Sequence, residues 1–100
     1  MRISEQEHHI IVDVLKHHFG ESAAVWLFGS RADDNARGGD IDLMVETPLQ
    51  SADEIVEAKL DALVELHQRL GDQKIDLVIK RPGGSQLPIH RVARESGVLL

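Results

Sequence analysis

The spacing of hydrophobic positions along the chain predicts helices in some segments and strands in others. Apolar side chains recur three and four positions apart over residues 5–19, which is the period of an amphipathic helix. Ser4 and Glu7 stand at capping-box spacing, so this helix is predicted to begin just after Ser4. Residues 51–70 show the same period behind a second capping-box sequence that starts at Ser51, and they predict a second amphipathic helix.

Short apolar runs bounded by turn residues predict the strands. Residues 24–28 form such a run before Gly29, and residues 41–46 form another before a Thr-Pro pair. Residues 74–79 predict a third strand, in which Ile75, Leu77 and Ile79 share one face and Asp76 takes the other. A short helix is predicted over residues 88–96. The apolar end of the chain after it is expected to pack on its own domain, and docking of a partner is the alternative.

The lengths of the connections predict how these strands pair. The link between the first two strands is too short for a parallel crossover, so these strands are expected to be antiparallel. The helix over residues 51–70 gives the long link that a parallel, right-handed crossover to the third strand needs. The chain is therefore predicted to be a single α/β (α+β) domain over residues 1–100, with a small mixed sheet and flanking helices.

Composition and charge narrow the classes of function. The formal net charge of −6 argues against a stand-alone nucleic-acid binder, which needs a basic surface to displace counterions from phosphates. The chain has no cysteine, which excludes disulfides and thiolate metal sites. The sequence shows no apolar signal core and no apolar run of membrane-spanning length, so a cytoplasmic location is expected.

Two aspartates at the start of the second predicted strand are the strongest chemical signal. Asp40 and Asp42 are two positions apart, and residues at that spacing in a strand point to the same face. Like charges this close resist joint ionisation unless a cation relieves them, and hard divalent cations prefer oxygen ligands. The predicted pairing brings Asp76, near the start of the third strand, to the same edge. An exposed polar strand end is the alternative interpretation of the Asp-x-Asp pair.

The turn after the first predicted strand supplies groups that suit phosphate. Gly29 allows close approach of the backbone, Ser30 offers a hydroxyl, and neighbouring amide groups can bind phosphate oxygens. Arg31 and Arg37 either neutralise a triphosphate or are solvated loop residues, and the second interpretation is the more common one for such a loop. A phosphate turn opposite metal-binding carboxylates describes a site for a nucleoside triphosphate.

The remaining candidate residues favour structural roles. No two histidines in the first predicted helix are separated by three or four positions, the spacing that a zinc pair on one helix face needs. Asp13 lies four positions from both His9 and His17 and is expected to pair with them at the surface. Trp26 is expected to lie in the core rather than to form a stacking platform for a base.

The order Gly29-Ser30, Asp40-x-Asp42, Asp76 resembles the motif of the DNA polymerase beta-like nucleotidyltransferase superfamily. A chain of this size is similar to its minimal nucleotidyltransferase (MNT) proteins. The resemblance implies that the three aspartates are catalytic and hold two Mg²⁺ ions. It implies that Asp40 and Asp42 are shared ligands and that Asp76 either holds the second ion or acts as the base.

The same resemblance implies a co-substrate and a partner. Gly29, Ser30 and Arg31 would bind ATP, and AMP would be the group transferred. MNT proteins resembling this chain pair with small all-helical HEPN-type proteins, so transfer to a tyrosine of a HEPN toxin would make this chain the antitoxin. Two alternatives remain open: transfer to a small molecule held by a separate substrate-binding subunit, and a non-catalytic antitoxin that blocks its partner by contact. Neither long nucleic acid nor a membrane is an expected partner.

Overall fold

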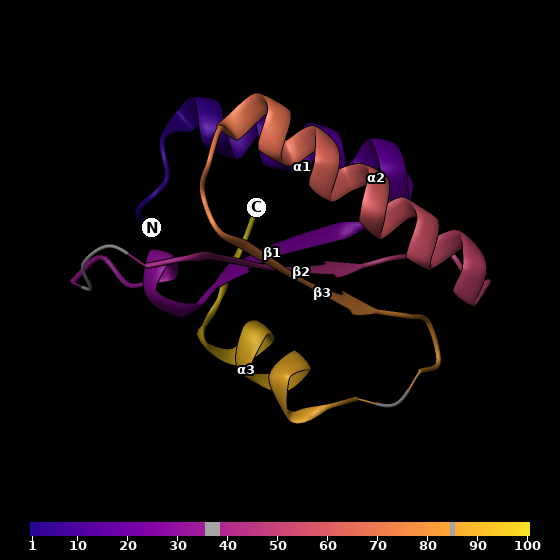
Figure 1. The fold of residues 1–100 in the computed structure, drawn as a ribbon. Helices are drawn as coiled ribbons and strands as arrows, with labels where there is room; N and C mark the ends of the chain where they lie inside the picture. The colour runs from indigo at the N-terminus through magenta and orange to yellow at the C-terminus, as the bar shows by residue number, and fades with distance from the viewer. Residues whose placement is uncertain (36–38, 85) are drawn as a thin grey trace.

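The computed structural model describes residues 1–35, 39–84 and 86–100, and the predicted role of Arg37 therefore lies outside the described residues. In chain order the elements are α1 (Glu5–Phe19), β1 (Ala24–Phe28), the 3₁₀ helix η1 (Gly29–Ala32), β2 (Ile41–Glu46), α2 (Ala52–Leu70), β3 (Ile75–Lys80), α3 (Pro88–Ser96) and β4 (Val98–Leu99). The sheet is four-stranded and mixed, in the order β3-β2-β1-β4. Helices α1 and α2 cover one face of it and α3 covers the other (Figure 1). None of the helices in this described part of the chain is long and apolar enough to cross a membrane.

Helix α1 begins where the sequence predicts because its first turn is capped from both sides. The amide of Glu7 donates to Ser4 Oγ (3.0 Å), and the amide of Ser4 donates to Glu7 Oε1 (2.8 Å). At the start of α2 the amide of Glu54 donates to Ser51 Oγ (3.4 Å). Among the described residues, however, the return bond of a capping box is not formed there. The second cap is therefore simpler than the predicted one.

The strand pairing that the connection lengths predict is confirmed. Strands β1 and β2 are antiparallel, with Phe28 opposite Asp42. Strands β2 and β3 are parallel, with Asp42 opposite Asp76. The last residue of β1 and the first residues of β2 and β3 consequently meet at one end of the sheet, called here the carboxylate end.

Alternation along the strands separates the core from the site. The main core lies between the sheet and the α1–α2 layer, and its strand residues include Leu27, Ile41, Leu43, Val45, Ile75 and Leu77. Met44, two positions after Asp42, instead packs in a separate cluster with Phe28 and with Ala93 of α3. Since residues two apart share a strand face, Asp42 and Asp76 lie on the face that carries α3. The main core therefore packs against the opposite face of the sheet from these carboxylates.

The ends of the sheet differ from the prediction. Strand β3 starts and ends one residue later than predicted, and it includes Lys80 because the ladder with β2 extends to the amide of Thr47, which donates to the Lys80 carbonyl (3.0 Å). The apolar end of the chain forms β4, a strand that the sequence does not predict, with Leu99 opposite Trp26. A segment of two residues is too short to show a hydrophobic period. This strand is therefore identified only by its pairing with β1. The expectation that this end packs on its own domain is confirmed.

Candidate active site

Gly29 follows directly after β1. Both its backbone conformation and the space around it favour glycine. Its φ is +72°, in the left-handed region that costs other residues about 1–2 kcal/mol. A Cβ at this position would also overlap the carboxylate of Asp42. The turn therefore passes directly against the Asp42 side chain, as the predicted close approach of backbone and site requires.

A second glycine brings the turn that begins at Gly29 against the start of β2. Gly39 has a φ of +92°, and a Cβ there would overlap Ser30 Oγ. The Ser30 hydroxyl thus lies beside the residue that precedes Asp40. The sequence interpretation did not single out Gly39, although a glycine directly before the first aspartate is the signal that could have identified it.

Hydrogen bonds from the guanidinium of Arg31 hold the turn in place. Its Nε donates to the Gly39 carbonyl (3.2 Å), its Nη1 to the Arg2 carbonyl (3.1 Å) and its Nη2 to Gln73 Oε1 (3.3 Å). These bonds tie the turn to the N-terminal segment and to the loop before β3. The binding of ATP by Gly29, Ser30 and Arg31 stays a prediction.

Asp42 occupies an unfavourable position for a negative charge. Partial burial raises the pKa of its carboxyl above the ordinary value, and the like charges of Asp76 and Asp40 raise it further. Asp76 is exposed and Asp40 is half-buried, and Asp40 Oδ2 lies 3.6 Å from Lys74 Nζ. The structure therefore brings Asp42 and Asp76 together, and it places Asp40 at the margin with a lysine as neutralising partner.

The donor set at the carboxylate end suits a hard divalent cation. All the candidate ligands are carboxylate oxygens, which Mg²⁺ prefers, and a cation would relieve the repulsion that raises the pKa of Asp42. In the described residues no three acidic or histidine side chains are gathered into a ready-made metal site. Mg²⁺ usually takes one or two carboxylates together with substrate phosphates and water, so Asp42 and Asp76 fit such a site.

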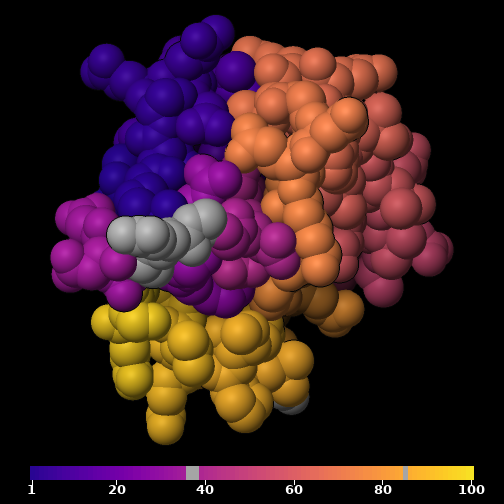
Figure 2. Space-filling model, turned by 60° about the vertical axis from the view of Figure 1, so that its left-hand side comes forward, coloured from indigo at the N-terminus to yellow at the C-terminus, as the bar shows by residue number. Residues whose placement is uncertain are grey.

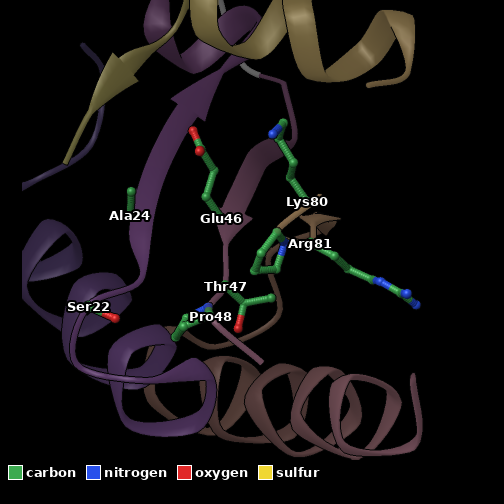
Figure 3. A pocket seen from close by; sticks show the side chains of 8 residues that line it. Ser22, Ala24, Glu46, Thr47, Pro48, Lys80 and Arg81 are labelled. Carbon is green, nitrogen blue, oxygen red and sulfur yellow. The ribbon is translucent and has the colours of Figure 1, made fainter. Parts of the chain in front are cut away.

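Two shallow cavities lie at opposite ends of the sheet. One of about 350 Å³ has Asp42 and Asp76 in its lining, together with apolar residues that include Phe28, Val78 and Ile89. The other, of about 300 Å³, lies where β2 and β3 end and is drawn in Figure 3. Its lining contains none of the predicted site residues. The predicted chemistry therefore belongs to the first cavity.

The comparisons with known proteins agree with this geometry. Residues 10–100 match the sequence model of a family described as "Polymerase beta, Nucleotidyltransferase". The chain belongs to this family. No curated protein matches it. Membership supports nucleotidyl transfer as the class of reaction, and the small mixed sheet with flanking helices is consistent with a polymerase beta-like nucleotidyltransferase domain.

The other residues considered in the sequence of this nucleotidyltransferase domain have structural contacts. Asp13 does not pair mainly with histidines on its own helix as expected, because Arg69 Nη1 of α2 donates to its Oδ2 (2.9 Å). That partner comes from packing of α1 on α2, which a one-helix pattern does not contain. Trp26 donates from Nε1 to Glu46 (2.9 Å) and is half-buried against the Phe28 cluster, so it lies at the margin of the core rather than within it as predicted.

Replacing Asp42 by asparagine is expected to stabilise the metal-free domain. Because the folded pKa of Asp42 is raised, this carboxyl favours the folded state most below its unfolded pKa. That contribution is lost as the pH rises through its folded pKa. The melting temperature of Asp42→Asn should therefore exceed that of the native protein by a few degrees at pH 7, and the difference should shrink as the pH falls through the carboxylate range. Thermal unfolding at several pH values measures both trends, and an equal or lower melting temperature at pH 7 would contradict the electrostatic assignment.

Proposed function

We propose that this domain is a Mg²⁺-dependent nucleotidyltransferase that moves AMP from ATP onto a tyrosine of a small helical HEPN-type toxin and so acts as its antitoxin. The observation that supports the transferase site most strongly is the register of β2 and β3, which sets Asp42 opposite Asp76 beside the Gly29 turn. The similarity to MNT proteins supports the choice of nucleotide and partner.

The proposed reaction is an in-line displacement at the α-phosphorus. The tyrosine oxygen forms a bond to that phosphorus, the bond from the α-phosphorus to the bridging oxygen breaks, and pyrophosphate leaves. The phenolic proton passes to the carboxylate of Asp76, which lies on the exposed edge strand where an acceptor can approach. Asp42, flanked by Asp40, would hold Mg²⁺, which when bound supplies neutralisation of the charge on the phosphate oxygens.

The turn residues bind the rest of the triphosphate in this proposal. Ser30 donates its hydroxyl to a β- or γ-phosphate oxygen, and Gly29 lets the backbone come close. Gly39 keeps the Ser30 hydroxyl beside the start of β2. Arg31 holds the turn in place through its three bonds and presents positive charge near the bound phosphates.

The mass of the co-expressed HEPN-type protein distinguishes the three classes of function. With the native domain, we expect mass increments equal to AMP on a tyrosine of that protein, and with Asp42→Ala we expect none. An unmodified partner in a tight complex with both forms would contradict the enzymatic proposal and favour a steric antitoxin. An unmodified partner together with AMP transfer to a small molecule would favour the substrate-subunit alternative.

ATP and Mg²⁺ together are expected to stabilise the domain. Binding at one hundred times the dissociation constant adds about 2.7 kcal/mol to the free energy of unfolding. The melting temperature should therefore rise with the two ligands together and rise less with either alone, because each contributes part of the site. Asp42→Asn is the control variant and should respond only weakly. A flat melting temperature of the native protein across millimolar Mg²⁺ plus ATP would contradict a converged site.

A further inference from the structure

The outer edge of β3 presents backbone groups that no other strand occupies. Strand β3 is at the end of the sheet order, with β2 on its inner side. The amide of Ile41 donates to the Lys74 carbonyl and that of Thr47 to the Lys80 carbonyl, both at 3.0 Å. In a parallel ladder the backbone groups that face one neighbour belong to alternate residues. The even-numbered residues of β3 therefore face β2, and Ile75, Leu77 and Ile79 direct their amide and carbonyl groups outward.

Helix α3 closes one end of this edge. The carbonyl oxygen of Ile79 lies 3.1 Å from His90 Nε2, while His90 Nδ1 accepts the amide of Leu87 (3.1 Å). With Nδ1 as an acceptor, Nε2 carries the proton and donates it to Ile79. This bond confirms that odd-numbered carbonyls point outward. Across the described residues, the outward groups of Ile75 and Leu77 have no protein partner.

The open part of the edge lies in a groove that leads to the carboxylates. The cavity of about 350 Å³ is lined by β3 itself, by Lys59 and Leu63 of α2, and by Ile89 of α3, and it includes Asp76 and Asp42. Figure 2 shows the orange atoms of this part of the chain at the surface beside the salmon atoms of α2 and above the yellow atoms of α3. The groove thus joins free strand groups, apolar walls and the candidate catalytic carboxylate.

We propose that an extended segment of the acceptor protein adds to this edge as a further strand and presents its hydroxyl to Asp76. The free amide and carbonyl groups of Ile75 and Leu77 match the repeat of a peptide backbone, which is the basis of strand addition to a sheet edge. Side chains of the added strand alternate between the two faces. Those on one face pack toward Leu63, and those on the other lie beside Asp76 and Ile89. The inference rests on the proposed function, since it concerns how a protein acceptor reaches that site.

The register of the added strand against β3 determines which of its side chains can react. A hydroxyl-bearing side chain opposite Asp76 shares the face of Asp76 and Asp42, because directly opposed residues in a sheet point the same way. Its oxygen forms the bond to the α-phosphorus of ATP, pyrophosphate leaves with the bridging oxygen, and the hydroxyl proton passes to Asp76. Side chains one position earlier or later point to the α2 face and are not reached, so the edge selects one position of the acceptor.

A peptide pair tests the proposal directly. The probe is a soluble peptide of alternating valine and threonine with one central tyrosine and terminal lysines, and its control has backbone N-methyl groups at alternate positions that block its edge. With ATP and Mg²⁺, we expect AMP on the tyrosine of the first peptide and at least tenfold less on the second. Equal labelling of the two, or no labelling of either by a preparation that modifies its protein acceptor, would overturn the proposal. Labelling of the protein acceptor reports on the proposed function separately.

Two variants at one position test the edge within the domain itself. Ile75→Pro removes an outward amide without removing a bond to β2, whereas Ile75→Ala loses a similar side chain and keeps the amide. Transfer to the acceptor should fall about two- to tenfold more in the first variant than in the second, as expected for one hydrogen bond. Equal rates would contradict the proposal.

Amide hydrogen exchange of the native protein supplies a measurement that needs no variant. Because they are unpaired among the described residues, the amides of the largely buried Ile75 and Leu77 should exchange faster in the free domain than those of Asp76 and Val78, and they should become protected when the acceptor binds. Unchanged exchange at Ile75 and Leu77 in the complex would overturn the proposal. Protection of Ile75 and Leu77 in the free protein together with dimers in sedimentation would assign the edge to a second copy of the chain instead.

Discussion

Replacing Asp42 by asparagine is expected to reduce AMP transfer at least about a hundredfold, a size typical of losing a group that acts on the reacting atoms. The substitution keeps the shape of the side chain but removes the negative charge of the partly buried Asp42 carboxyl. A neutral amide would bind Mg²⁺ more weakly than a carboxylate does. The rate of AMP incorporation into the acceptor, measured at saturating ATP, gives the effect.

The stability of the same variant makes this result interpretable. Because Asp42→Asn is expected to melt above the temperature of the native protein, lost transfer cannot be attributed to unfolding. Asp61→Asn, which makes the same chemical change at an exposed position on α2, serves as the matched control and should retain the native rate. A native rate in Asp42→Asn, or an equal loss in Asp61→Asn, would contradict the assignment of Asp42.

Replacing Gly29 by alanine is expected to damage both the fold and the transfer activity. The positive φ of +72° costs alanine about 1–2 kcal/mol in the free energy of unfolding. The new Cβ would also overlap the Asp42 carboxylate, and turning that side chain off its preferred rotamer adds about 1 kcal/mol. A displacement of a reacting group by about 1 Å can lower a rate about a hundredfold, so transfer should fall by that order.

Gly71→Ala separates the two causes of that loss. Gly71 has a φ of +84°, similar to that of Gly29, but a Cβ there would have no neighbour within 4 Å. Denaturant unfolding should show a backbone cost of about 1–3 kcal/mol for each variant and the further cost of the overlap with Asp42 only for Gly29→Ala. Transfer by Gly71→Ala should remain native at a temperature where it is folded. Equal activity of the two variants would show that the Gly29 turn does not position Asp42.

The parts of the fold that the sequence predicts are those in which neighbouring residues carry a clear hydrophobic period, a cap or a short connection. The bounds of α1 follow from its period and from the reciprocal cap between Ser4 and Glu7. The pairing of β1 with β2 follows from a link too short for a crossover. Strand β4 was missed because its stability comes from register with Trp26 and Leu27 and not from its own residues. Likewise, the partner of Asp13 depends on how α1 packs against α2.

The candidate site was predictable to the extent that its residues lie on regular strands. Alternation and pairing were enough to place Asp42 beside Asp76, since both positions are fixed by the ladder. The role of Gly39 could not be predicted in this way, because it depends on how close Ser30 Oγ lies to Gly39 in the folded chain. The groove along β3 also could not be predicted from the sequence. It depends on which strand lies at the edge of the sheet and on which helices pack beside that strand.

The position of a label in ATP tests the central claim most directly. The purified domain and its proposed HEPN-type partner are incubated with Mg²⁺ and with ATP labelled either at the α-phosphate or at the γ-phosphate. The account predicts that the α-label becomes covalently attached to the partner, that the γ-label leaves in pyrophosphate, and that Asp42→Asn attaches neither. Attachment of the γ-label, or of neither label by the native protein in a formed complex, would contradict it.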